Sequence, residues 1–254
     1  MDWFEQLFIN EAKPALKRHS GGDEPSIDYA ADILNKTIVE YSSEKIISVY
    51  TGAFSECRLL TAIDLPNVTS LGSSAFANCS SLENVNIPNA TNIGRSAFAN
   101  CITLRSIDLP KATFIDNAAF MSCSKLADVN IPNVTSISNA AFSQCRSISS
   151  IDAPNVTHIG VNAFVSCTAL TTVNIPHAIN IGSSAFLACT QLASLYLPGS
   201  SICALQHSNA LSYTKIAKAD GGLIYVPASL LASYQAANNW SYYSAYFSAI
   251  EEAV

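Results

Sequence analysis

The sequence predicts an α/β repeat solenoid, because one unit with three constant positions is repeated along most of the chain. Among the 254 residues, a 22-residue unit recurs seven times between Val49 and Leu205 without an insertion. Each unit contains an Ala-Phe pair, a Cys three residues after the Phe and a Pro nine residues after the Cys. These positions are Phe54, Phe76, Phe98, Phe120, Phe142, Phe164 and Phe186; Cys57, Cys79, Cys101, Cys123, Cys145, Cys167 and Cys189; and Pro66, Pro88, Pro110, Pro132, Pro154, Pro176 and Pro198.

Each unit is expected to contain one short strand. In the second unit, Val85 and Ile87 alternate with Asn84 and Asn86, which is the pattern of a strand with one buried face. The following Pro88 has no N–H to donate and ends the strand. The Ala-Phe stretch lacks alternation and is predicted to form a short helical or 3-10 turn. A single coil cannot bury its own apolar face, so we expect Phe to stack on Phe and Cys on Cys in successive coils.

The pattern Cys-x-x-Leu-x-x-Val-x-Ile-Pro, followed by Ala-Phe, resembles the BspA-like, Treponema-type class of bacterial leucine-rich repeats. The resemblance covers 49–205 closely. It implies a right-handed leucine-rich-repeat superhelix with a parallel β-sheet on its concave face, turns on its convex side and a cap at each end. It also implies a surface-associated or prophage-encoded protein with an interaction role.

The chain before the repeats divides into two segments. Residues 1–25 are predicted to form a helical arm and linker, in which Asp2 and Glu5 make a capping box. The arm either docks on the first coil, which we favour, or binds a membrane surface or a partner. Residues 26–48 are interpreted as a degenerate first coil that aligns Tyr41 with Ile63. Within it, we expect Thr37–Tyr41 and Lys45–Val49 to pair as two strands.

Residues 206–254 are predicted to form a C-terminal strand and helical cap. Leu223–Pro227 repeats the strand-Pro motif, and Leu230, Leu231, Tyr234 and Ala237 follow at helical spacing. Asn239 is expected to cap a second helix that carries Trp240, Tyr243, Phe247 and Ile250 on one face. These aromatic residues either plug the open end of the solenoid, which we favour, or form a binding surface.

Composition restricts the classes of partner. Charged residues make up only 13% of the chain and the net charge is −6, without a basic patch, so no nucleic-acid partner is expected. No apolar run approaches 18 residues, so no integral membrane segment is expected. The N-terminus lacks the pattern of a signal peptide, which predicts a cytoplasmic location by default and leaves surface or virion association open.

The eight cysteines are interpreted as structural. Seven of them occupy one interior position of the repeat, where Cys acts as a small buried hydrophobic residue. The alternatives are disulfides between coils, which parallel Cβ atoms about 4.8 Å apart would strain, and a zinc site, which a straight column cannot surround.

No residue pattern predicts catalysis, a cofactor or a metal site. His158 and His177 lie in neighbouring coils but at different repeat positions. The carboxylates of Asp64, Asp108 and Asp152 would be roughly 10 Å apart on an open face, with nothing to raise a pKa. The sequence therefore predicts a protein that is not an enzyme.

The candidate binding residues are the outward-pointing strand positions of the concave face. They are Asp64, Asn86, Asp108, Asn130, Asp152, Asn174 and Tyr196. Their Asp/Asn alternation either serves a protein or glycan ligand or only separates like charges. The predicted function is a non-catalytic binding module for a protein or glycan partner, of the adhesion or host-interaction type. The alternative is a structural component of a larger assembly such as a phage virion or tail. Weak self-association is left open.

Overall fold

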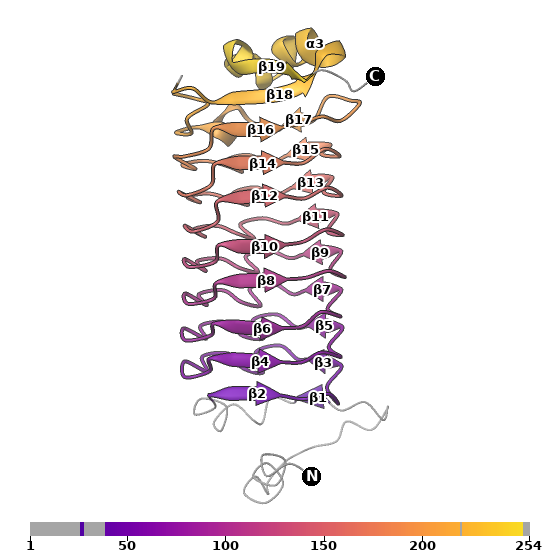
Figure 1. Cartoon of the computed structure of the whole chain (residues 1–254), viewed down its shortest axis with the longest axis vertical. Coiled ribbons are helices and arrows are strands. Elements are labelled where there is room, and N and C mark those ends of the chain that lie inside the picture. The colour runs from indigo at the N-terminus through magenta and orange to yellow at the C-terminus, as the bar shows by residue number, and fades with distance from the viewer. Residues whose placement is uncertain (1–25, 28–38, 219, 251–254) are drawn as a thin grey trace, which may run out of the picture.

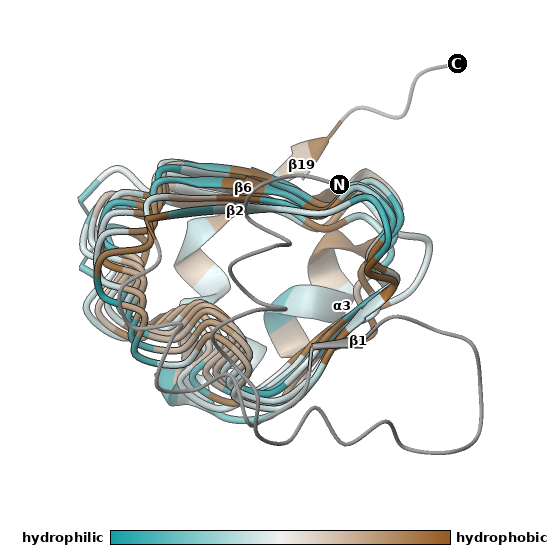
Figure 2. Cartoon of the chain, turned by 90° about the horizontal axis from the view of Figure 1, so that it is seen from below, coloured by the Kyte–Doolittle hydropathy of each residue, from teal (hydrophilic) through white to brown (hydrophobic). Residues whose placement is uncertain are grey.

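The coils stack as a straight column in the computed structural model, which describes residues 26–27, 39–218 and 220–250 (Figure 1). Seen along the column, successive coils lie over one another, with β2 and β6 on one side and β1 on another (Figure 2). The predicted N-terminal arm, including Asp2 and Glu5, lies outside the described residues.

One side of the column is built from short parallel strands, one in each coil. They are β2 (Glu40–Ser42), β4 (Ala62–Asp64), β6 (Asn84–Asn86), β8 (Ser106–Asp108), β10 (Asp128–Asn130), β12 (Ser150–Asp152), β14 (Thr172–Asn174), β16 (Ser194–Tyr196), β18 (Leu223–Pro227) and β19 (Phe247–Ile250). Ile63 is paired with Val85, 22 residues later, so each strand is shifted by one repeat from its neighbour, as the stacking of identical coils predicted. We call the outward side of the even-numbered strands, from β2 to β18, the strand face.

A second parallel sheet follows the Pro turn of each coil. Its nine strands are β1 (Ser26–Ile27), β3 (Ser48–Val49), β5 (Ser70–Leu71), β7 (Asn92–Ile93), β9 (Phe114–Ile115), β11 (Ser136–Ile137), β13 (His158–Ile159), β15 (Asn180–Ile181) and β17 (Ala204–Leu205). Threonine hydroxyls bind this sheet together, since Thr91 Oγ1 donates to the Thr69 carbonyl at 3.1 Å.

The Ala-Phe stretch forms a hydrogen-bonded turn on the third side. The Ala75 N–H donates within its own coil to Gly72, whereas the Phe76 N–H donates to Ala97 of the next coil. Because every second N–H is used by the neighbouring coil, the stretch does not continue into a helix. Ser74 and Asn78 adopt left-handed φ values of 55° and 62° in this turn.

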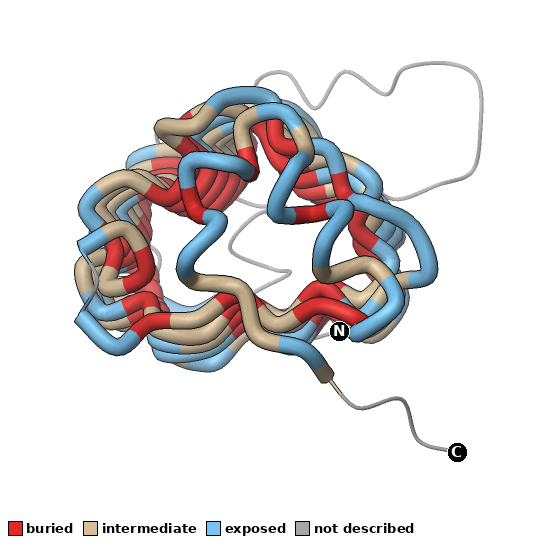
Figure 3. The backbone as a smooth tube through the Cα atoms, turned by 90° about the horizontal axis from the view of Figure 1, so that it is seen from above, coloured by how far each residue is buried: buried red, intermediate tan, exposed pale blue. Residues whose placement is uncertain are grey.

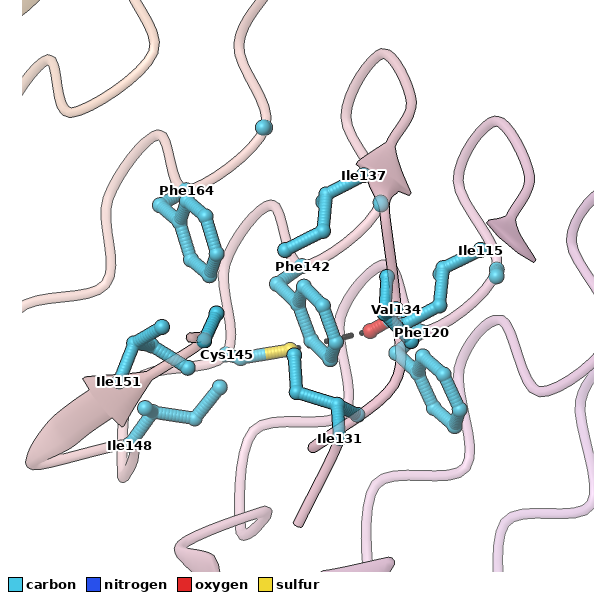
Figure 4. Packing of buried hydrophobic residues seen from close by; sticks show 14 of the residues in the cluster. Ile115, Phe120, Ile131, Val134, Ile137, Phe142, Cys145, Ile148, Ile151 and Phe164 are labelled. Carbon is cyan, nitrogen blue, oxygen red and sulfur yellow. Dashed lines mark hydrogen bonds between the residues drawn. The ribbon is translucent and has the colours of Figure 1, made fainter. Parts of the chain in front are cut away.

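The core consists of columns of identical side chains. Buried positions recur at the same places in successive coils (Figure 3). The seven phenylalanine rings stack with centroids 5.0–5.4 Å apart and interplanar angles of 5–10°. None of the eight cysteines forms a disulfide and all are buried, which confirms their interpretation as core residues. The Cys145 thiol donates to the Phe120 carbonyl of the preceding coil at 3.0 Å (Figure 4).

The first described coil aligns with the repeats, but its internal pairing was predicted wrongly. Tyr41 is opposite Ile63, as expected. The predicted pairing of Thr37–Tyr41 with Lys45–Val49 is wrong, because β2 pairs with β4, whereas β3 pairs with β1 and β5. The two strands of one coil belong to different sheets, so each pairs with its counterpart one coil away.

The coil pattern continues beyond Leu205. The Phe186 N–H donates to the Ala210 carbonyl, so Ala210 and Leu211 take the places of the Ala-Phe pair. The strand of this coil is β18, which pairs with β16. Leu in place of Phe and a longer connection hide this coil from the 22-residue spacing.

The C-terminal segment covers the end of the column. After η2 (Ser208–Leu211), β18 and η3 (Ala228–Leu230), it comprises α3 (Leu231–Ala236), η4 (Trp240–Tyr246) and β19. Trp240 is fully buried, and its Nε1 donates to the Cys203 carbonyl at 2.6 Å. The Tyr234 hydroxyl accepts from the Cys203 N–H at 2.8 Å, whereas Tyr242 is 74% exposed.

The prediction of a second helix reaching Ile250 is wrong. The 3-10 helix ends at Tyr246, and Phe247–Ile250 pairs with β18 as a parallel strand. The backbone groups on the edge of β18 need partners, and an extended segment satisfies them where a helix would not. Asn239 precedes η4 with φ 63°, and its side chain donates to the Leu205 carbonyl instead of capping the helix.

Candidate partner-binding face

The seven predicted site residues lie in one column on the strand face. Each is the last residue of its three-residue strand, from β4 to β16. The side chains from Asp64 to Asp152 are exposed, and those of Asn174 and Tyr196 are half-buried. The parallel register therefore brings together, in coil order, all the residues that the sequence placed there.

The Asp and Asn side chains of this column are hydrogen-bonded in pairs. Asn86 Nδ2 donates to Asp64 Oδ1 at 2.7 Å. The same bond joins Asn130 to Asp108 at 2.7 Å and Asn174 to Asp152 at 2.9 Å. We call these three pairs the Asp–Asn dyads. Each dyad fixes the orientation of its carboxylate and amide, and leaves one carboxylate oxygen, one amide N–H and the amide oxygen for other partners.

The strand ladder is interrupted between the dyads. The three-residue strands form separate ladders, β2-β4-β6, β8-β10 and β12-β14-β16-β18-β19. The two breaks fall between Asn86 and Asp108 and between Asn130 and Asp152. At each of these two interfaces a hydroxyl that precedes the strand bonds to the coil below: Thr103 Oγ1 donates to the Ser80 carbonyl and Ser147 Oγ to the Ser124 carbonyl, both at 2.8 Å.

The row of site residues ends in aromatic side chains on its C-terminal side. Tyr196 is opposite Tyr225 of β18, and the two rings stack with centroids 4.4 Å apart and planes 8° apart. Sequence reasoning missed Tyr225, although its place in the Leu223–Pro227 strand motif matches that of Tyr196. Each ring covers one face of the other, so the pair presents mainly its edges and hydroxyl groups outward.

A second outward column was also missed. It is formed by the first residue of each strand, two positions before the first column: Glu40, Ala62, Asn84, Ser106, Asp128, Ser150, Thr172, Ser194 and Leu223. The alternation of a strand was the signal that could have found it. From β2 to β18, these two columns contain five acidic residues, Glu40, Asp64, Asp108, Asp128 and Asp152, and neither Lys nor Arg.

The face offers binding groups without a catalytic arrangement. Asp64, Asp108 and Asp152 each lie two coils from the next, and all three are exposed to solvent. Within the described ranges, no group of three His, Cys, Asp or Glu residues lies where it could hold a metal ion. His177 takes the place of an asparagine in the turn, with its Nδ1 2.6 Å from the Pro154 carbonyl. Across the same part of the chain, every helix is too short or too polar to span a bilayer.

Three solved structures of bacterial proteins are similar to parts of this chain. The pneumococcal vaccine antigen PcpA is similar with a TM-score of 0.52 and 15% identity, over 85% of this chain and 67% of that one. A T. pallidum leucine-rich-repeat protein is 24% identical over 63% of this chain and 72% of that one, with a TM-score of 0.45. A Eubacterium ventriosum leucine-rich-repeat protein is 24% identical, with a TM-score of 0.40, over 51% of this chain and only 43% of that one.

The family comparison covers most of the column. No curated protein matches the chain. The family described as BspA type leucine rich repeat region (6 copies) matches residues 34–127 and 113–221, which include all seven Phe-Cys coils. Leucine-rich repeats of this kind generally serve in non-catalytic binding modules. The chain therefore belongs to the BspA-type leucine-rich-repeat family.

Proposed function

We propose that this protein is a non-catalytic module that binds another protein through the strand face. The observation that carries the proposal is the row of Asp–Asn dyads, whose polar groups are held in fixed directions on an exposed surface. Groups that are already oriented lose less conformational entropy when a partner binds.

A protein partner fits the aromatic end better than a sugar does. A sugar ring binds an aromatic side chain by lying on its face. Tyr196 and Tyr225 use one face each for their mutual stack, and the remaining faces point along the column toward neighbouring coils. Their edges and hydroxyls suit the mixed polar and apolar contacts of a protein interface, where Tyr is enriched.

The test uses the chain as an affinity bait for cell-surface proteins, followed by two matched variants. Asn130→Lys places a long cation on the strand face, whereas Asn92→Lys makes the same change at an exposed position of the second sheet. We expect a partner captured by the unmodified chain to be lost with Asn130→Lys and retained with Asn92→Lys, with unchanged circular dichroism in both. Equal capture by the two variants would reject the strand face. Capture of glycans alone would reject the protein partner.

A further inference from the structure

The strand face repeats every second coil, and this longer period constrains the partner. The first column reads Asp64, Asp108, Asp152 and Tyr196 at positions 44 residues apart. Neighbouring parallel strands are separated by about 4.8 Å, so these four residues recur at intervals of roughly 9.6 Å. The phenylalanine stack of the same coils has a spacing of 5.0–5.4 Å per coil, so the interval on the face lies between roughly 9.6 and 10.8 Å.

One extended backbone conformation has a matching period. The polyproline II helix has three residues per turn and a rise of about 3.1 Å per residue, so every third side chain returns to the same side after roughly 9.3 Å. A β-strand returns after about 6.7 Å. An α-helix returns after seven residues, or roughly 10.5 Å, which also fits the interval. Its backbone carbonyls are used within the helix, however, and are not free to accept hydrogen bonds from the face.

The charges on the face determine which side chains fit. The two columns of the strand face hold five acidic residues and no basic one between β2 and β18. In each dyad, one oxygen of the Asp carboxylate accepts from Asn and the other can accept from a cation. Lys or Arg at every third position of a polyproline II segment would therefore meet Asp64, Asp108 and Asp152 in turn.

The groups between the aspartates suit the backbone of such a segment. A polyproline II helix has no internal hydrogen bonds, so its carbonyls are free to accept. Asn86, Asn130 and Asn174 lie one coil above each aspartate, and each retains an amide N–H that can donate to such a carbonyl. The row ends at Tyr196 and Tyr225, and proline-rich segments bind to surfaces lined by aromatic residues.

Building on the proposed function, we propose that the strand face binds a basic, proline-rich polypeptide in the polyproline II conformation. Its Lys or Arg residues occur at every third position, followed by an apolar residue or Pro at Tyr196. The recognised ligand is thus an extended segment of a protein partner.

The test compares two peptides of one composition. The first has three lysines at every third position in a Pro and Ala background and ends in Pro, and the second has the three lysines consecutively. Binding to the whole chain is measured by fluorescence anisotropy at low salt. We expect the spaced peptide to bind about fivefold more tightly or better, with the difference decreasing as salt screens the charges. Equal affinity for the two peptides would overturn the inference.

Two charge-matched variants locate the binding. Asp108→Asn with Asp152→Asn removes two charges from the face, and Glu44→Gln with Glu56→Gln removes two exposed charges elsewhere. The first pair should weaken binding of the spaced peptide about fivefold and the second should leave it unchanged, since each exposed ion pair contributes only a small part of the affinity. Equal effects of the two pairs would contradict the inference. If peptides fail while Asn130→Lys still abolishes protein capture, the binding face stands and only its ligand is different.

Discussion

The interfaces between coils are of two kinds on the strand face and of one kind in the core. Where Asn follows Asp, as between Asp108 and Asn130, the side chains hydrogen-bond and the strands pair. Where Asp follows Asn, as between Asn86 and Asp108, the strands belong to separate ladders, and the Thr103 hydroxyl bonds to the preceding coil.

The packing of the core is the same at both kinds of interface. The Phe76–Phe98 and Phe98–Phe120 stacks have centroid distances of 5.2 and 5.3 Å, although they belong to the two different kinds of interface. Thiol-to-carbonyl bonds cross both kinds as well, at 3.2 Å for Cys101 and 3.1 Å for Cys123. The 22-residue period therefore maintains the stack, whereas the 44-residue period shapes the strand face and its ladder.

The thiol column should make stability strongly dependent on alkaline pH. Burial raises the pKa of the Cys101, Cys145 and Cys167 thiols, and raises that of Cys203 to about 12. The hydrogen bond with Cys101 and burial together raise the pKa of Cys79. In the unfolded chain these thiols ionise near pH 8.5. Their stabilising contribution is therefore complete below about pH 8.5 and is lost as pH rises toward the folded values.

We expect the free energy of unfolding to fall by about 1.4 kcal/mol per thiol for each pH unit above ~8.5. Urea unfolding with a reductant present, between pH 7.5 and 10, measures this slope. A free energy that stays constant over that range would show that the thiols ionise in the folded column and are not part of a sealed core.

Truncation of a stacked ring tests whether the core is indifferent to the kind of interface. Phe120 and Phe164 are both fully buried, each between two rings of the stack. The coil of Phe120 borders one interrupted interface, whereas the strand of the Phe164 coil pairs on both sides. Phe120→Ala and Phe164→Ala should each reduce the free energy of unfolding by about 3–5 kcal/mol, because each leaves a cavity that the neighbouring coils cannot fill. A difference larger than ~1 kcal/mol between the two variants, in urea unfolding, would mean that the surface period reaches the core.

The smallest effects should distinguish the two kinds of surface link. Asn130→Ala removes an exposed dyad bond, and Thr103→Val removes a half-buried hydroxyl bond at the other kind of interface. We expect losses of about 0.5 and 1 kcal/mol respectively, since a hydrogen bond stabilises more where water does not replace it.

Unfolding of the double variant shows whether the two links are independent. The expected loss is the sum of the two single losses, because the residues share no partner. A marked departure from additivity would indicate that the two kinds of interface are coupled through the strands.

Periodicity in the chain was sufficient to predict the coils and their columns. Each Phe, Cys and strand residue has a copy 22 residues away, and stacking identical coils places identical side chains in contact. The period alone therefore predicted that Asp64 to Tyr196 lie in one row and that the cysteines lie in the core. It also aligned Tyr41 with Ile63, where the repeat is degenerate.

Hydrogen-bond partners and the C-terminal segment required the folded structure. The alternation of Asp and Asn indicated a 44-residue period, but the spacing of the coils decides that Asn130 bonds to Asp108 and not to Asp152. Phe247–Ile250 has helical spacing, yet it becomes a strand because the edge of β18 offers unpaired backbone groups. Tyr225 joins Tyr196 for a similar reason, since a coil of different length still pairs strand to strand. Such partners are selected by contacts between segments distant in the chain, and no local pattern encodes them.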